Sequence, residues 1–213
     1  RVRLAPGETR MAEIALPVPA LACWDVDTHR MIVPPGDYEV FAGASSADVR
    51  QSATLTVRGP APAPRQLLGR AVAAADFDDY GDITLVDATR ETGDAVAPDD
   101  PGRPGWIVFR DVDLDGGPAR PEPAAPAGPG GYSVTARVAR AQPGDAWLEF
   151  WHAGQGSDGP GEGTLLGRVA VPSTGGRYTW TEVTAGLAPA AGVGDLYLVL
   201  RGAQRLASFR IRR

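Results

Sequence analysis

The chain has 213 residues, 43% hydrophobic and 22% charged, a balance typical of a globular protein of one large or two ordinary domains. The net charge of -5, with acidic residues concentrated from Asp76 to Asp100, excludes nucleic-acid-binding proteins, which need a basic surface against phosphates. The single cysteine, Cys23, excludes an internal disulfide and a thiolate metal cluster. We expect Cys23 to be a small buried apolar residue beside Trp24.

All 21 basic residues are arginine and the chain lacks lysine and asparagine, a bias typical of GC-rich bacterial genomes. Polar recognition must therefore use Arg, Gln, Ser, Thr or carboxylates. No apolar run reaches the ~20 residues of a membrane span, so we expect no membrane partner. The first ten residues lack the apolar core of a signal peptide, and the choice between a cytoplasmic and a secreted protein stays open.

Short apolar runs separated by 27 Gly and 20 Pro predict an all-β protein. Near the N-terminus we expect a strand from Arg1 and a second over Met11 to Leu16. The stretch Val33 to Arg50 begins with a Pro-Pro-Gly breaker and then alternates apolar and polar residues, the period of a half-buried strand. A last strand is expected over Ala53 to Val57. About four strands are too few to close a sandwich.

A Pro-Ala linker over residues 59–66 predicts a domain boundary, between a first domain at 1–58 and a second at 67–213. The second domain is predicted to contain eight strands, a number that suits a jelly roll. These are Ile83 to Val86, Trp106 to Phe109, Tyr132 to Ala139, Ala146 to His152, Thr164 to Val171, Tyr178 to Val183, Asp195 to Arg201 and Leu206 to Arg212. We expect the Pro-rich segment Gly116 to Gly131 to be a surface loop.

Three motifs of the first domain occur in a specific order: LAPGE (Leu4 to Glu8), LACWD (Leu21 to Asp25) and the stretch Val33 to Arg50. They resemble the C-terminal fibronectin type III-like domain of family 3 glycoside hydrolases, the β-glucosidase family. That domain has further strands before its first motif, so the resemblance implies part of an immunoglobulin-like sandwich from a longer polypeptide. Its catalytic domains would lie upstream and would be partners of this region.

Five phrases of the second domain resemble a family 6 carbohydrate-binding module and imply a β-sandwich jelly roll and a carbohydrate partner. They are GWIVFRDVDL (Gly105 to Leu114), YSVTARVAR (Tyr132 to Arg140), GTLLGRVAVPSTGG (Gly163 to Gly176), DLYLVLRG (Asp195 to Gly202) and LASFRIR (Leu206 to Arg212). The resemblance implies a non-catalytic accessory region of a β-glucosidase-type enzyme. The alternative is a purely structural, docking or oligomerisation module.

The family's principal sugar cleft uses a tyrosine, a tryptophan and an asparagine, and the matching positions fall near Asp100, at Arg177 and at Arg205. All three residue types are therefore absent. One interpretation is a cleft that has lost sugar binding. The other is that Arg177 and Arg205 converge on an anionic sugar, because guanidinium groups pair with carboxylates through two hydrogen bonds. Tyr178 could supply an aromatic platform or point into the core.

A second candidate site lies on the segment AWLEFWH, where alternation puts Trp147, Glu149 and Trp151 on one face of a strand. Two aromatic rings around a carboxylate have the composition of a sugar platform, and some members of the resembled family bind sugar on a sheet face. The other interpretation is that both tryptophans cover the sheet beneath the Pro-rich loop.

We expect no cofactor, no metal and no catalytic residues. The resemblance implies a structural calcium held by carboxylates, but the matching positions are Ala73 to Ala75 and Arg205 to Ala207, which leaves too few oxygen ligands. The acidic segment Asp76 to Asp82 does not have the spacing of a calcium loop, and we expect a solvated turn there. The two histidines lie in separate domains, and no nucleophile, zinc or phosphate motif occurs.

Overall fold

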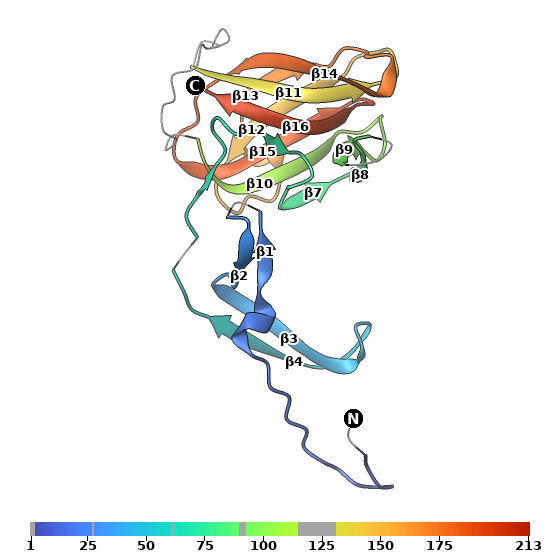
Figure 1. Cartoon of the computed structure of the whole chain (residues 1–213), viewed down its shortest axis with the longest axis vertical. Coiled ribbons are helices and arrows are strands. Elements are labelled where there is room, and N and C mark those ends of the chain that lie inside the picture. Colours follow the sequence, from blue (N-terminus) through green and yellow to red (C-terminus); the bar gives the residue numbers. More distant parts are fainter. Residues whose placement is uncertain (1–2, 27, 61, 90–92, 115–130) are drawn as a thin grey trace. The chain divides into compact units, whose positions relative to one another are not determined.

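The computed structural model describes residues 3–26, 28–60, 62–89, 93–114 and 131–213, and the chain divides into two compact units, Arg1–Ala63 and Pro64–Arg213. The predicted all-β fold class is confirmed (Figure 1). The helical segments among the described residues are two short 3-10 turns, η1 (Val18–Leu21) and η2 (Pro160–Glu162). In the part of the chain that the structure describes, neither helix has the length or the apolar character to cross a membrane.

The N-terminal unit contains two separate two-stranded sheets. Strand β1 (Cys23–Asp25) pairs with β2 (Arg30–Ile32), and β3 (Gly36–Ser45) pairs with β4 (Asp48–Val57). Strand β3 forms as predicted, but it is not half-buried on one face, because Tyr38 alone of its ten residues is partly buried. The Tyr38 hydroxyl donates to the carbonyl of Pro34 at 2.8 Å. No described residue of this unit is buried, so its sheets have no core of their own.

Three predictions for the other segments of this unit are wrong. The strand expected from Arg1 is absent over residues 3–10. Met11 to Leu16 forms no strand, and Met11 and Ile14 are 87% and 90% exposed. Apolar alternation alone does not make a strand, because the backbone also needs a hydrogen-bonding neighbour and none of the described residues supplies one. Cys23 is exposed rather than buried, since β1 pairs only with β2 and no second layer in this unit covers them.

The C-terminal unit consists of two six-stranded sheets (Figure 1). The first has the order β13-β12-β15-β10-β5, with β7 also paired to β10. Its strands are β5 (Arg65–Gln66), β7 (Asp79–Gly81), β10 (Gly105–Asp113), β12 (Trp147–Ala153), β13 (Thr164–Ala170) and β15 (Val193–Arg201). Arg65 and Gln66, expected in the linker, therefore belong to a sheet of this unit.

The second sheet has the order β14-β11-β16-β9-β8, with β6 also paired to β16. Its strands are β6 (Val72–Ala73), β8 (Ile83–Asp87), β9 (Asp94–Pro98), β11 (Tyr132–Arg140), β14 (Gly176–Leu187) and β16 (Arg205–Arg212). All eight predicted strands of the unit are present. The short strands β5, β6 and β7 and the strand β9 are additional. The predicted Pro-rich loop falls, apart from Gly131, on residues 116–130, which lie outside the described residues.

One hydrophobic core fills the space between the two sheets. Phe109 and Phe150 of the first sheet meet Phe209 of the second, with ring centroids 5.3 and 6.2 Å apart. Each of the three is at most 2% exposed. Because side chains alternate along a strand, the residues between these core positions must point to the outer face of each sheet. The predicted β-sandwich is confirmed, and the outer face of the first sheet carries the candidate site around Trp147, Glu149 and Trp151.

Candidate functional site

The outer face of β12 carries the side chains predicted to form a sugar platform. Leu148 and Phe150 are fully buried in the core, which leaves Trp147, Glu149 and Trp151 on the opposite face, as alternation predicted. Both tryptophans are half-buried, whereas Glu149 is only 8% exposed. The outer face of this strand therefore presents two indole rings and an almost fully covered carboxylate.

Trp151 lines a cavity of about 190 Å³ together with Trp106 of β10. The other residues that line it are Pro104, Pro160, Gly161, Val199 and Arg201. Trp106 rests edge-on against the buried Tyr197, with ring centroids 5.4 Å apart. A Cβ added at Gly81 of β7 would lie 2.6 Å from the indole nitrogen of Trp106, so only glycine lets β7 run beside the Trp106 ring. We refer to this space as the tryptophan cavity.

Polar contacts hold Trp151 in place at the rim of the tryptophan cavity. The Trp151 Nε1 donates to Glu149 Oε2 at 3.1 Å, and Arg201 Nε donates to Glu149 Oε1 at 2.9 Å. The Arg201 side chain remains 47% exposed. Two aromatic rings next to a guanidinium that can donate to hydroxyl groups match what a pyranose requires, an apolar ring face plus directed polar groups.

Sequence reasoning missed Trp106 and Arg201. Both come from strands far from β12 in the chain, and the register of three strands brings them together: Val199 pairs with Glu149 on one side and with Trp106 on the other. A signal for Trp106 existed, since the same alternation that buries Ile107 turns Trp106 outward. The register itself cannot be obtained from strand periodicity.

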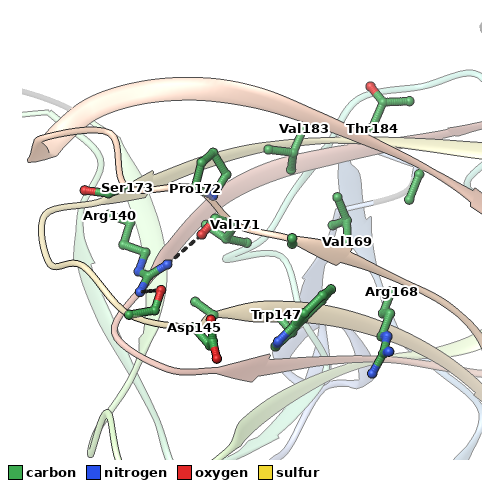
Figure 2. Close-up of a pocket in the computed structure, with 14 residues that line it drawn as sticks. Arg140, Asp145, Trp147, Arg168, Val169, Val171, Pro172, Ser173, Val183 and Thr184 are labelled. Carbon is green, nitrogen blue, oxygen red and sulfur yellow. Dashed lines mark hydrogen bonds between the residues drawn. The ribbon is translucent and has the colours of Figure 1, made fainter.

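Trp147 does not join the tryptophan cavity, and to this extent the predicted platform is wrong. The Arg168 guanidinium lies 4.7 Å from the Trp147 ring centroid. Both line a different cavity of about 640 Å³, which also contacts Arg140 and Asp145 and lies between the edge strands β13 and β14 (Figure 2). Figure 2 shows Trp147 and Arg168 at one end of this cavity and Arg140 at the other. The hypothesis of a single surface shared by Trp147 and Trp151 is replaced by two separate cavities.

The structure brings Arg177 and Arg205 together in a third cavity, of about 240 Å³, which we call the arginine cavity. Arg205 extends over the ring of Tyr178 at 5.2 Å, and its Nη1 donates to the carbonyl of Asp87 at 3.1 Å. Tyr178 is 37% exposed and supports Arg205 instead of lining the cavity itself. Tyr178 therefore takes neither of the two positions considered from the sequence, an open platform or a place in the core.

A buried ion pair fixes the loop beside the tryptophan cavity. Asp195 is 1% exposed and accepts from Arg110 Nη1 at 2.7 Å and from the Gly156 amide at 2.9 Å. The carboxylate of Asp195 raises the pKa of Arg110 above its ordinary value, so this arginine stays charged. The hydroxyl of Tyr197 donates to the Ser157 carbonyl at 2.8 Å. These contacts anchor the β12–β13 loop, which supplies Pro160 and Gly161 to the cavity.

The two segments matched to a calcium site lie side by side, as the resemblance implies. The Ala74 amide donates to the carbonyl of Ala207 at 2.8 Å, and neither segment contributes a carboxylate. No group of three His, Cys, Asp or Glu suited to a metal occurs among the described residues. The adjoining acidic turn differs from the prediction, because Asp78 is not simply solvated: it pairs with Arg65 through contacts of 2.9 and 3.0 Å.

Comparisons with known proteins agree with the fold of the C-terminal unit. Residues 73–213 match the model of the family 6 carbohydrate-binding modules, and the chain belongs to that family. Two solved modules cover 70% of this chain. One, from Clostridium stercorarium in complex with cellobiose, is 25% identical, is itself 97% covered and has a TM-score of 0.52. The other, a β-1,3-glucan-binding module from Bacillus halodurans, is 24% identical, is 99% covered and has a TM-score of 0.54.

Residues 1–46 match the model of a fibronectin type III-like domain, as the ordered motifs predicted. A curated relative, probable beta-glucosidase L of Emericella nidulans, is 39% identical over 57 residues, 27% of this chain. The chain spans 8% of the length of that relative. The predicted recognition is thereby confirmed: a fibronectin type III-like segment precedes a family 6 carbohydrate-binding module.

Proposed function

We propose that the C-terminal unit binds a carbohydrate chain on the outer face of its first sheet, through the tryptophan cavity. The observation that carries the proposal is the convergence of Trp106, Trp151 and Arg201 on one cavity, with Glu149 fixing both Trp151 and Arg201. Aromatic rings cover the apolar face of a pyranose, and the guanidinium donates to its hydroxyls.

The size of the tryptophan cavity indicates how much of a sugar chain it takes. At about 190 Å³ it is smaller than the ~300–1,000 Å³ typical of pockets that enclose a drug-sized ligand. It therefore suits one sugar ring of a longer chain, with the neighbouring rings lying along the sheet face. The solved module in complex with cellobiose and the β-1,3-glucan-binding module make neutral β-glucans the first ligands to test.

Affinity electrophoresis of the full chain in gels containing β-glucan or xylan tests this function. We expect the native chain to be retarded by at least one polysaccharide and Trp151→Ala to migrate as in a gel without it. Trp24→Ala is the matched control, because it removes an exposed tryptophan from the other unit. Equal retardation of Trp151→Ala and the native chain would place binding elsewhere.

We further propose that this chain is the C-terminal accessory region of a family 3 glycoside hydrolase of the β-glucosidase type, from a bacterium. The ordered motifs LAPGE and LACWD and the similarity to a fungal β-glucosidase support the enzyme family, and the absence of Lys and Asn supports the source. In this proposal the partners are the catalytic domains of the same polypeptide. Assays of the isolated chain with an aryl β-glucoside should give no hydrolysis above buffer, and measurable turnover would contradict the accessory role.

A further inference from the structure

We propose that the arginine cavity binds an acidic sugar residue, with a carboxylate held between Arg177 and Arg205. The cavity lies at one end of the sandwich, where Arg140 is the last residue of β11, Arg177 the second of β14 and Arg205 the first of β16. Because β11 runs antiparallel to both neighbours, its end meets their beginnings. The fold therefore gathers three arginines that are far apart in the sequence.

The charge of the cavity lining is the first argument. The lining contains Arg140, Arg177 and Arg205 but no Asp or Glu, in a chain whose net charge is -5. None of the three forms an ion pair among the described residues. Arg140 and Arg205 donate to backbone carbonyls, which orient the guanidinium groups without neutralising them. Three uncompensated positive charges favour an anionic ligand.

The rigidity of the lining is the second argument. Arg140 is 4% exposed, and its Nη1 donates to the Val171 carbonyl at 2.7 Å, the dashed contact in Figure 2. Gln204 is 3% exposed, and its Nε2 donates to the carbonyls of Trp147 and Arg201 at 2.7 and 2.9 Å. Arg205 is held by the Tyr178 ring and by the Asp87 carbonyl. Among the three arginines that line the arginine cavity, Arg177 is the exposed one. A ligand would therefore enter the cavity beside Arg177.

The class of anion follows from size and from the proposed carbohydrate function, on which this inference rests. About 240 Å³ accommodates one sugar ring rather than a chain. A planar carboxylate fits the fork of a guanidinium through two parallel hydrogen bonds. Gln142 adds a neutral amide at the wall that can serve hydroxyl groups. A uronic acid combines all three features, whereas a neutral hexose leaves the arginine charges unmatched.

Calorimetric titration of the full chain carrying Trp151→Ala, which removes the proposed site for neutral glucan, tests the inference with three probes: a glucuronic-acid-containing oligosaccharide, its neutral glucose counterpart and inorganic sulfate. We expect binding of the glucuronate probe, at least about tenfold weaker binding of the neutral one, and loss of affinity as NaCl is raised. Equal affinity for the glucuronate and neutral probes, or for glucuronate and sulfate, overturns the proposal, as does absence of glucuronate binding.

Variants locate the acidic-sugar site and separate it from the tryptophan cavity. Arg177→Gln should weaken glucuronate binding about tenfold or more, and since Arg177 is exposed the fold should be unaffected. Arg137→Gln is the matched control, because Arg137 is likewise an exposed arginine and does not line the arginine cavity. Trp151→Ala should leave glucuronate binding unchanged and abolish neutral glucan binding. Glucuronate binding unaffected by Arg177→Gln overturns the assignment even where the proposed glucan binding holds.

Discussion

The two units of this chain have similar alternating strands but differ in what covers them. In Arg1–Ala63 the hairpin of β3 and β4 has ten residues in each strand, yet no described residue of the unit is buried. In Pro64–Arg213 two six-stranded sheets enclose one core in which Phe150, Leu198 and others are fully buried. Alternation therefore produces a stable fold only where a second layer receives the apolar face.

Hydrogen exchange should show the largest difference between the units. We expect backbone amides of β15, such as that of Leu198, to exchange only through global unfolding, whereas amides of β3 exchange close to the unprotected rate. The physical reason is that a two-stranded hairpin without a packed face is only marginally stable in water. Exchange in the full chain, followed by mass spectrometry or NMR, measures both sets together. Comparable protection in β3 and β15 would contradict the predicted difference in stability between the two units.

A pair of phenylalanine substitutions compares the units energetically. Phe150→Ala should lower the free energy of unfolding by about 3–5 kcal/mol, because it leaves a cavity against Phe209. Phe41→Ala, at a residue that is 56% exposed, should change it by less than about 0.5 kcal/mol. Urea unfolding monitored by tryptophan fluorescence measures both, and similar losses would mean that β3 is covered in solution.

Ion pairs give the next contrast. Asp195→Ala should destabilise the C-terminal unit by about 2–4 kcal/mol, since it leaves the Gly156 amide without its acceptor and removes the buried carboxylate that pairs with Arg110. The Arg110 side chain keeps 30% exposure, which reduces the cost below that of a fully enclosed pair. Asp48→Ala, which removes a surface pair with Arg50, is the control and should leave the midpoint of urea unfolding unchanged. A stable Asp195→Ala protein would show that the β12–β13 loop does not depend on this carboxylate.

The smallest expected effect concerns the rim of the tryptophan cavity. Glu149→Gln keeps one acceptor oxygen for the Trp151 Nε1 but loses both the charge and the second acceptor opposite Arg201, so β-glucan binding should weaken about two- to fivefold. Glu182→Gln, on the other sheet, is the charge-matched control. A complete loss of binding in Glu149→Gln would give the carboxylate a direct contact with sugar.

Sequence periodicity predicted the strands correctly where the structure also buries their apolar face. Leu148 and Phe150 were assigned to the core by alternation, and the structure confirms both. Met11 to Leu16 shows the limit of this reasoning, because the same alternation without a neighbouring strand gives irregular chain. Strand β9 was missed because its DAVAP sequence contains proline and small residues, and it forms only between β8 and β16.

The candidate sites were predictable residue by residue but not as groups. Trp151 and Glu149 followed from spacing along one strand, whereas Trp106 and Arg201 joined them through the register of β10, β15 and β12. Arg177 and Arg205 followed from the family resemblance. Arg140 and Gln204 could not be predicted, because their role depends on carbonyls of distant segments such as that of Val171.

The central claim is that carbohydrate meets the chain at Trp106 and Trp151, and the chain's own tryptophans test it directly. The five indole N–H signals, from Trp24, Trp106, Trp147, Trp151 and Trp180, can be followed together by NMR during titration with a β-glucan oligosaccharide. We predict that the signals of Trp106 and Trp151 shift with the same saturation curve while those of Trp24 and Trp180 stay in place. Saturable shifts confined to Trp147 or Trp180, or no shift with either a β-glucan or a xylan oligosaccharide, would contradict the account.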